Sequence, residues 1–137
     1  METHYKSSSH AVYLIRLHIV FVTKYRRKCI NDEIGNDLKD AFSGVLEGWR
    51  CKLIEFGFEE DHAHLLVDIH PALDISALIN NLKSATSKRI RGKHWNWLRH
   101  FYSKPVFWNR AYFVSSVGGA TLETVKVYVA SQGKEAP

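Results

Sequence analysis

Two segments of this chain place apolar side chains at every second position. The first runs from Val12 to Val22 and the second from His62 to Ile69. Side chains of a β-strand point alternately to opposite faces, so each segment presents one continuous apolar face. The two faces consist of Tyr13, Ile15, Leu17, Ile19 and Phe21, and of Ala63, Leu65, Val67 and Ile69. A strand with one apolar face covers a core on that side only, which favours an antiparallel sheet.

Helix signals follow each of these segments. Asn31 is a good N-cap for a helix that runs to about Leu46, and Gly48 is expected to help end it. Asp74 caps a second predicted helix over Ile75–Arg91. The residues of this second helix expected to face inward are Ile75, Leu78, Ile79 and Leu82.

The remaining elements complete a βαββαβ order with one added helix. Further strands are predicted at Cys51–Phe58 and Ala111–Val117, and a final helix from a Thr121 cap to about Gln132. This order is typical of a ferredoxin-like, RRM-like α+β sheet. We expect one domain over residues 1–137, with residues 1–10 loosely attached. Gly92–Trp108 is aromatic and basic, and no element is predicted there.

Charge is distributed unevenly along the chain. Between Ile75 and Leu122 there is no acidic residue. The eight Lys and Arg side chains of this stretch give it a charge of +8, which exceeds the net charge of +5 of the whole chain. The rest of the chain is therefore net negative. A basic region on an otherwise acidic chain indicates a polyanionic partner, and nucleic acid is favoured over a basic helix face that is merely solvated.

Composition favours a cytoplasmic protein. No apolar run is long enough to span a bilayer, and the polar start lacks a signal-peptide pattern. The two cysteines, Cys29 and Cys51, are expected to be free thiols in a reducing compartment.

A pair of histidines is the first candidate site. His62 and His64 share the strand face opposite the apolar one, so their imidazoles can converge on one metal ion. Paired histidines also occur on strands that bind nothing. A histidine-triad hydrolase would need a third alternating histidine, and that position is Leu66.

The last predicted helix carries the second candidate. Tyr128 and Gln132 are four positions apart at the margin of its apolar stripe. A tyrosine hydroxyl can attack a phosphodiester and form a covalent phosphotyrosine bond, and a metal that polarises the phosphate would compensate for its weak nucleophilicity. Taken in isolation, a tyrosine at such a position is more often a half-buried packing residue.

Several blocks, taken in order along the chain, resemble the small single-tyrosine transposases of the HUH nuclease class, which minimal bacterial and archaeal insertion sequences encode. HUH denotes His, hydrophobe, His, and is matched by His62-Ala63-His64. The flanking matches are His18–Lys28, Val117–Ala120 and Tyr128–Gln132. Many members have Pro where this chain has Glu60 and a bulkier residue at Ala63, but neither departure removes a catalytic group.

The resemblance implies a reaction on single-stranded DNA at the ends of a mobile element. Mg²⁺ or Mn²⁺ would be held by His62, His64 and Gln132, and Tyr128 would take the 5′ phosphate and free a 3′ hydroxyl. It also implies a homodimer that recognises DNA hairpins. The mobile helix at residues 121–133 of one subunit could complete the active site of the other.

Basic and aromatic side chains supply the predicted DNA contacts. The basic candidates are Lys24, Arg26, Arg27, Lys28, Lys83, Lys88, Arg89, Arg91 and Lys93. Trp95, Trp97 and Tyr102 could stack on unpaired bases or pack in the core. Three alternatives remain: a domesticated HUH nuclease that acts on genomic repeats, a non-catalytic ferredoxin-like nucleic-acid-binding module, and a zinc hydrolase with no need of Tyr128.

Overall fold

The computed structural model describes residues 5–7, 12–116 and 122–133, apart from the side chain of Leu122. Thr121, the predicted cap of the last helix, lies outside the described residues. The elements are β1 (Lys6–Ser7), β2 (Val12–Tyr13), β3 (Ile15–Thr23), the 3₁₀ turn η1 (Lys24–Arg26), α1 (Asp32–Gly48), β4 (Lys52–Glu59), β5 (His62–Ile69), α2 (Ile75–Leu98), β6 (Trp108–Ser116) and α3 (Leu122–Ser131).

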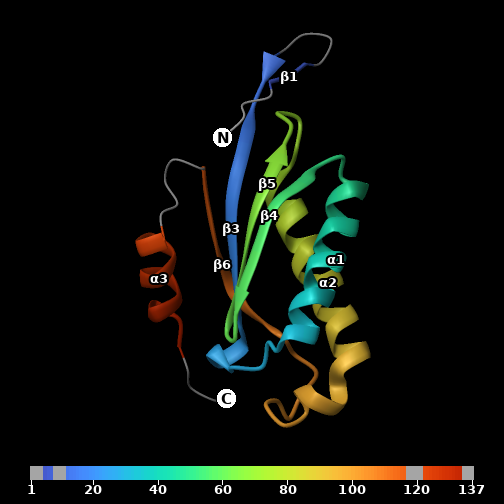
Figure 1. Cartoon of the computed structure of the whole chain (residues 1–137), viewed down its shortest axis with the longest axis vertical. Helices are drawn as coiled ribbons and strands as arrows, with labels where there is room; N and C mark the ends of the chain where they lie inside the picture. The colour runs from blue at the N-terminus through green and yellow to red at the C-terminus, as the bar shows by residue number, and fades with distance from the viewer. Residues whose placement is uncertain (1–4, 8–11, 117–121, 134–137) are drawn as a thin grey trace.

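The main sheet has the strand order β4-β5-β3-β6, and every neighbouring pair is antiparallel. β3 and β5 therefore occupy the centre. Helices α1 and α2 cover one face of the sheet, and α3 lies against the other (Figure 1). The predicted α+β fold, a βαββαβ sheet with an added C-terminal helix, is confirmed.

The central strand β3 contributes to a separate hydrophobic cluster on each face of the sheet. The predicted apolar faces of β3 and β5 lie under α1 and α2, where Ile19, Ala63 and Leu65 are fully buried. On the opposite face, Val20 and Val22 pack against Val125 and Val129 of α3. This second cluster is small, so far less apolar contact holds α3 than holds the other helices.

The helix starts follow the sequence closely. The Asn31 side chain accepts a hydrogen bond from the Ile34 amide at 2.8 Å, and Asp74 accepts one from the Ala77 amide at 3.1 Å. Both predicted N-caps are thus confirmed. Ile75, in contrast, is 37% exposed, so the prediction that it faces inward is wrong.

The helix ends differ from the sequence prediction. α1 ends in a Schellman motif: the Arg50 amide bonds the Glu47 carbonyl and the Cys51 amide bonds the Leu46 carbonyl, with Arg50 at φ 57°. Gly48 is the last residue of the helix, but the left-handed position that ends it is taken by Arg50.

α2 continues through Gly92 to Leu98, beyond the predicted end at Arg91. His94 has non-helical dihedrals there, and its Nε2 lies 2.6 Å from the Asp37 carboxylate of α1. The two helices are therefore linked at this irregular point. No described helix is long and apolar enough to cross a membrane.

Candidate active site

His62 and His64 lie on the face of β5 that α3 partly covers. Their ring centroids are 6.3 Å apart, and His18 of β3 adds a third imidazole 6.1 Å from His64. These rings line a cavity of about 310 Å³ between sheet and helix. Its lining residues are His18, Glu55, Glu59, His62, His64, Val125 and Lys126.

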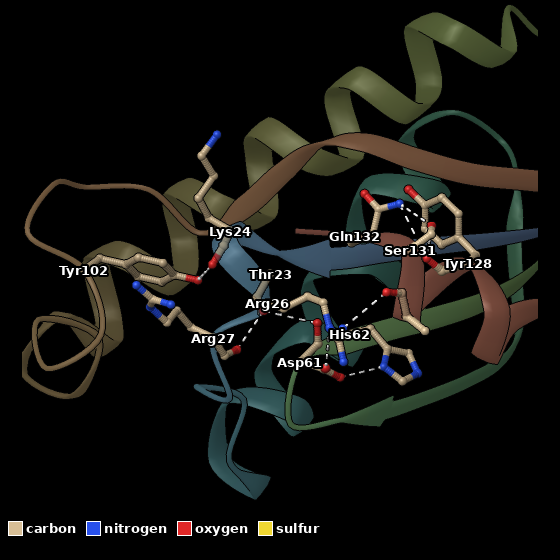
Figure 2. Close-up of polar contacts among 11 residues, drawn as sticks. Thr23, Lys24, Arg26, Arg27, Asp61, His62, Tyr102, Tyr128, Ser131 and Gln132 are labelled. Atoms are coloured by element: carbon tan, nitrogen blue, oxygen red, sulfur yellow. Dashed lines mark hydrogen bonds and ion pairs between the residues drawn. The ribbon is translucent and has the colours of Figure 1, made fainter. Parts of the chain in front are cut away.

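Asp61 fixes the orientation of His62. The carboxylate lies 2.9 Å from His62 Nδ1 and also accepts a hydrogen bond from Arg26 Nε at 3.4 Å (Figure 2). The contact with His62, supported by Arg26, lowers the pKa of Asp61, so the acid is ionised at neutral pH. An ionised acceptor makes Nδ1 the donor, which leaves the Nε2 lone pair of the neutral ring available. A carboxylate behind a histidine is the usual outer support of a metal ligand.

His64 is held in its neutral form by its surroundings. Burial lowers the pKa of His64, and the neighbouring His62 and His18 lower it further. Gly57 of β4 is paired with His64 in the sheet, and a Cβ at this glycine would overlap the imidazole ring. The ring therefore occupies space that only a glycine provides.

The two imidazoles fit a divalent ion but do not complete its coordination. Neutral nitrogen donors on a rigid strand suit a catalytic metal, which keeps positions open for substrate. Among the described residues, no group of three His, Cys, Asp or Glu side chains is arranged to hold a metal.

Tyr128 lies on α3 but does not line the histidine cavity. Its ring packs on Phe113 of β6 with centroids 5.5 Å apart. The hydroxyl is buried, and no described residue forms a hydrogen bond with it. Burial raises the pKa of Tyr128, so in this position the phenol is protonated.

Gln132 is also directed elsewhere. Its Oε1 accepts a hydrogen bond from Asn109 Nδ2 of β6 at 2.7 Å, and its Nε2 donates to Ser131 Oγ at 3.2 Å. The Tyr128 and Gln132 side chains lie together and apart from His62 (Figure 2). The structure thus brings the two histidines together and leaves Tyr128 and Gln132 outside their cavity.

The predicted basic residues fall into two groups. Lys24, Arg26, Arg27 and Lys28 lie in and just after η1, beside the end of β3. The others, Lys83, Lys88, Arg89, Arg91 and Lys93, are all on α2.

Several α2 cations have partners within the chain. Arg89 and Lys93 contact the Asp37 carboxylate at 3.2 and 3.1 Å, so both help to join α2 to α1. Arg91 donates to Ser87 at 3.0 Å. Lys83 donates to the Arg110 carbonyl at 2.6 Å, and burial, followed by the charges of Arg110 and Lys24, lowers its pKa.

Sequence reasoning missed two residues of this site. The alternation of its strand predicts that His18 lies on the polar face of the sheet. The alternation does not predict that this strand pairs with β5, which is what brings His18 close to His64. Gly57 gave no signal, because its importance depends on the register that pairs it with His64. The aromatic alternatives are partly decided: Tyr102 is buried in the core, while Trp97 is 41% exposed.

Comparisons with known proteins find transposases of similar sequence and fold. A transposase of insertion sequence IS200 from Salmonella typhimurium is 28% identical over 95% of this chain and 84% of its own. The ISDra2 transposase TnpA of Deinococcus radiodurans is 25% identical over 88% and 86% of the two chains. A Deinococcus radiodurans crystal structure superposes with a TM-score of 0.87 at 25% identity, covering 95% of this chain and 99% of the other.

A more distant solved structure supports the fold alone. A REP-associated tyrosine transposase bound to a REP hairpin aligns with a TM-score of 0.56 at 12% identity, over 90% of this chain and 68% of the other.

A βαββαβ sheet with a His-hydrophobe-His strand and a tyrosine-bearing C-terminal helix defines the HUH class of single-tyrosine transposases. The family model described as "Transposase IS200 like" matches residues 11–132, and the chain belongs to this family. Its function is that of a DNA transposase.

Proposed function

We propose that this transposase cuts and rejoins single-stranded DNA at the ends of an insertion sequence, with Tyr128 as the nucleophile. The observation that carries the proposal is the His62–His64 pair, with the Asp61 carboxylate behind His62 and an open cavity in front. His62, His64 and Gln132 would hold Mg²⁺ or Mn²⁺. When bound, the ion would supply positive charge to polarise the scissile phosphate.

The chemistry is a transesterification that conserves the energy of the phosphodiester. The Tyr128 oxygen forms a bond to phosphorus while the bond to the 3′ oxygen breaks. The phenol loses its proton, and the departing 3′ oxygen gains one. A 3′ hydroxyl on another DNA end then attacks the phosphotyrosine, which rejoins the strands and releases the tyrosine.

The positions of Tyr128 and Gln132 support a cleavage step that involves two subunits. Both side chains lie outside the histidine cavity of their own chain, and a small apolar cluster holds α3 to the sheet. We propose a homodimer in which α3 is repositioned so that Tyr128 of the partner subunit can reach the histidines.

The basic surfaces suit a DNA hairpin with single-stranded flanks. Cations on α2 and around η1 would neutralise backbone phosphates, which fixes the position of the DNA without reading its sequence. Arg89 and Lys93 remain 46% and 61% exposed at their side chains although they contact Asp37, so they can contact a phosphate as well.

The test is a covalent adduct. Hairpin-bearing single-stranded DNA from the flanks of this gene, incubated with Mg²⁺ or Mn²⁺, should give a protein–DNA species that survives denaturation. Tyr128→Phe should abolish the adduct and keep hairpin binding, whereas the control Tyr112→Phe should keep both. His62→Ala and His64→Ala should lose metal-dependent cleavage. An adduct with Tyr128→Phe would exclude Tyr128 as the nucleophile, and binding without any adduct would favour a non-catalytic module.

A further inference from the structure

A second cavity lies beside η1, apart from the histidines. It measures about 260 Å³ and is formed by the turn after β3 and the loop after α2. Its lining residues are Tyr25, Arg27, Phe101, Tyr102, Ser103, Lys104 and Val106. Sites for small molecules usually span about 300–1,000 Å³, so this cavity suits a single planar ring rather than a larger ligand.

The aromatic wall of this cavity is built from a strained turn. Tyr25 and Arg26 have φ values of 59° and 53°, in the left-handed region that side chains with a Cβ rarely adopt. Two consecutive residues in this state are held there by their surroundings, and such strain concentrates at functional sites. The opposite wall is rigid, because the Tyr102 hydroxyl donates to the Lys24 carbonyl at 2.8 Å.

The cavity is also positively charged. Lys24 and Arg27 lie 5.3 and 5.5 Å from the centre of the Tyr25 ring, and Lys104 lines the opposite side. None of the described residues that line it is acidic. Aromatic faces combined with cations are how proteins bind unpaired nucleotides: the base stacks on a ring and the adjoining phosphate meets a cation.

A chain of polar contacts links the cavity to the histidine site. Arg26 follows Tyr25 directly, donates to Asp61, and through Nη1 reaches the Ala130 carbonyl of α3 at 3.5 Å. Asp61 in turn orients His62. Figure 2 shows Arg26 between Asp61 and the end of α3. A nucleotide held at Tyr25 would thus be close in the structure to the groups that arrange cleavage.

We propose that the cavity at Tyr25 and Tyr102 binds one unpaired nucleobase of the single-stranded DNA substrate, with Arg27 and Lys104 at its phosphate. This inference rests on the proposed function for the nature of the substrate. It adds a binding site distinct from the metal, the nucleophile and the α2 cations.

The test combines DNA and protein changes. The probe is the hairpin oligonucleotide with both single-stranded flanks, in which each unpaired nucleotide in turn is replaced by an abasic one. With the unaltered protein, one abasic position should weaken binding by about tenfold to a hundredfold, the usual effect of losing one stacked base. Tyr25→Leu should weaken binding of the intact probe by a similar factor and make that abasic position nearly neutral.

Control variants separate stacking from folding. Tyr25→Phe should keep the affinity and the abasic sensitivity, because the ring remains. Tyr5→Leu, which removes an aromatic ring that is 70% exposed and outside the cavity, should keep both as well.

If no single abasic position weakens binding, or if Tyr25→Leu remains as sensitive to it as the unaltered protein, the nucleobase site is excluded. The abasic series with the unaltered protein decides this even if Tyr25→Leu fails to fold. Loss of the tyrosine adduct would instead contradict the proposed function, so the two failures can be told apart.

Discussion

At the scale of single residues, different neighbours hold the imidazole rings of His62 and His64 in position. His62 depends on a carboxylate from its own turn, and His64 depends on the absence of a side chain across the sheet. The His-hydrophobe-His spacing specifies neither support. The chemistry of this pair therefore comes from neighbours that a motif does not include.

Gly57→Ala should displace His64 and impair cleavage. The added Cβ would overlap the imidazole, and a misplacement of about 1 Å in an active site can cost about 10²-fold in rate. The rate of adduct formation at saturating Mn²⁺ measures this. Gly44→Ala is the matched control: a Cβ there meets open space on α1, so the rate should be unchanged. Equal rates for the two variants would mean that the position of His64 is not limiting.

At the scale of elements, the residue that ends α1 has a strained backbone conformation that a glycine would adopt without strain. Arg50 occupies the left-handed position of a Schellman motif, where glycine is the usual residue. Arg50→Gly should therefore stabilise the protein by about 1 kcal/mol, measured by urea unfolding. Gly48→Ala, at the last residue of α1, should stabilise it by about 0.4–1 kcal/mol, because a Cβ there meets open space and alanine has less backbone freedom in the unfolded chain. A destabilised Arg50→Gly variant would show that the arginine side chain contributes more than its backbone strain costs.

The contact between Asp37 of α1 and the cations of α2 should make the free energy of unfolding depend on pH. Burial alone would raise the pKa of Asp37, but hydrogen bonds from His94, Lys93 and Arg89 outweigh it and lower the pKa. A lowered folded-state pKa means that this contribution is fully present above the unfolded value of about 4 and is lost as pH falls through the folded value.

Asp37→Asn should accordingly lower the free energy of unfolding by about 1–3 kcal/mol at pH 7. The difference from the unaltered protein should begin to shrink below about pH 4, where Asp37 becomes protonated in the unfolded chain, and should vanish once it is protonated in the folded protein as well. Urea unfolding across pH 3–7 measures it. Asp40→Asn, on the same helix, is the control and should show neither effect. A difference that stays constant down to pH 3 would contradict the assignment.

The elements also differ in how well the sequence predicts them. Strand alternation and N-caps are local, and they predicted the sheet, the helix starts and the histidine face. The end of α2 was missed because the aromatic and basic composition of Gly92–Trp108 indicated no element, whereas packing and the His94–Asp37 contact extend the helix to Leu98. The placement of Tyr128 and Gln132 depends on how α3 docks onto β6, which no periodicity encodes.

At the scale of the whole molecule, one chain holds the proposed metal ligands and the proposed nucleophile in two separate places. The histidines face a cavity, while Tyr128 packs on Phe113 and Gln132 is bonded to Asn109. A symmetric dimer resolves this separation if each histidine pair receives the tyrosine helix of the other subunit. That arrangement predicts complementation between two inactive variants.

His64→Ala and Tyr128→Phe should each give no adduct alone. In a mixed dimer, the intact histidines of one subunit would meet Tyr128 of the partner subunit at one of the two sites. After random exchange of equal amounts, the adduct should recover to about a quarter of the unaltered level, because half of the dimers are mixed and each has one competent site. The measurement is the denaturation-resistant adduct, with subunit exchange checked by differently tagged chains. Exchange without any adduct would mean that Tyr128 serves the histidines of its own chain, so that α3 must travel across its own sheet for cleavage.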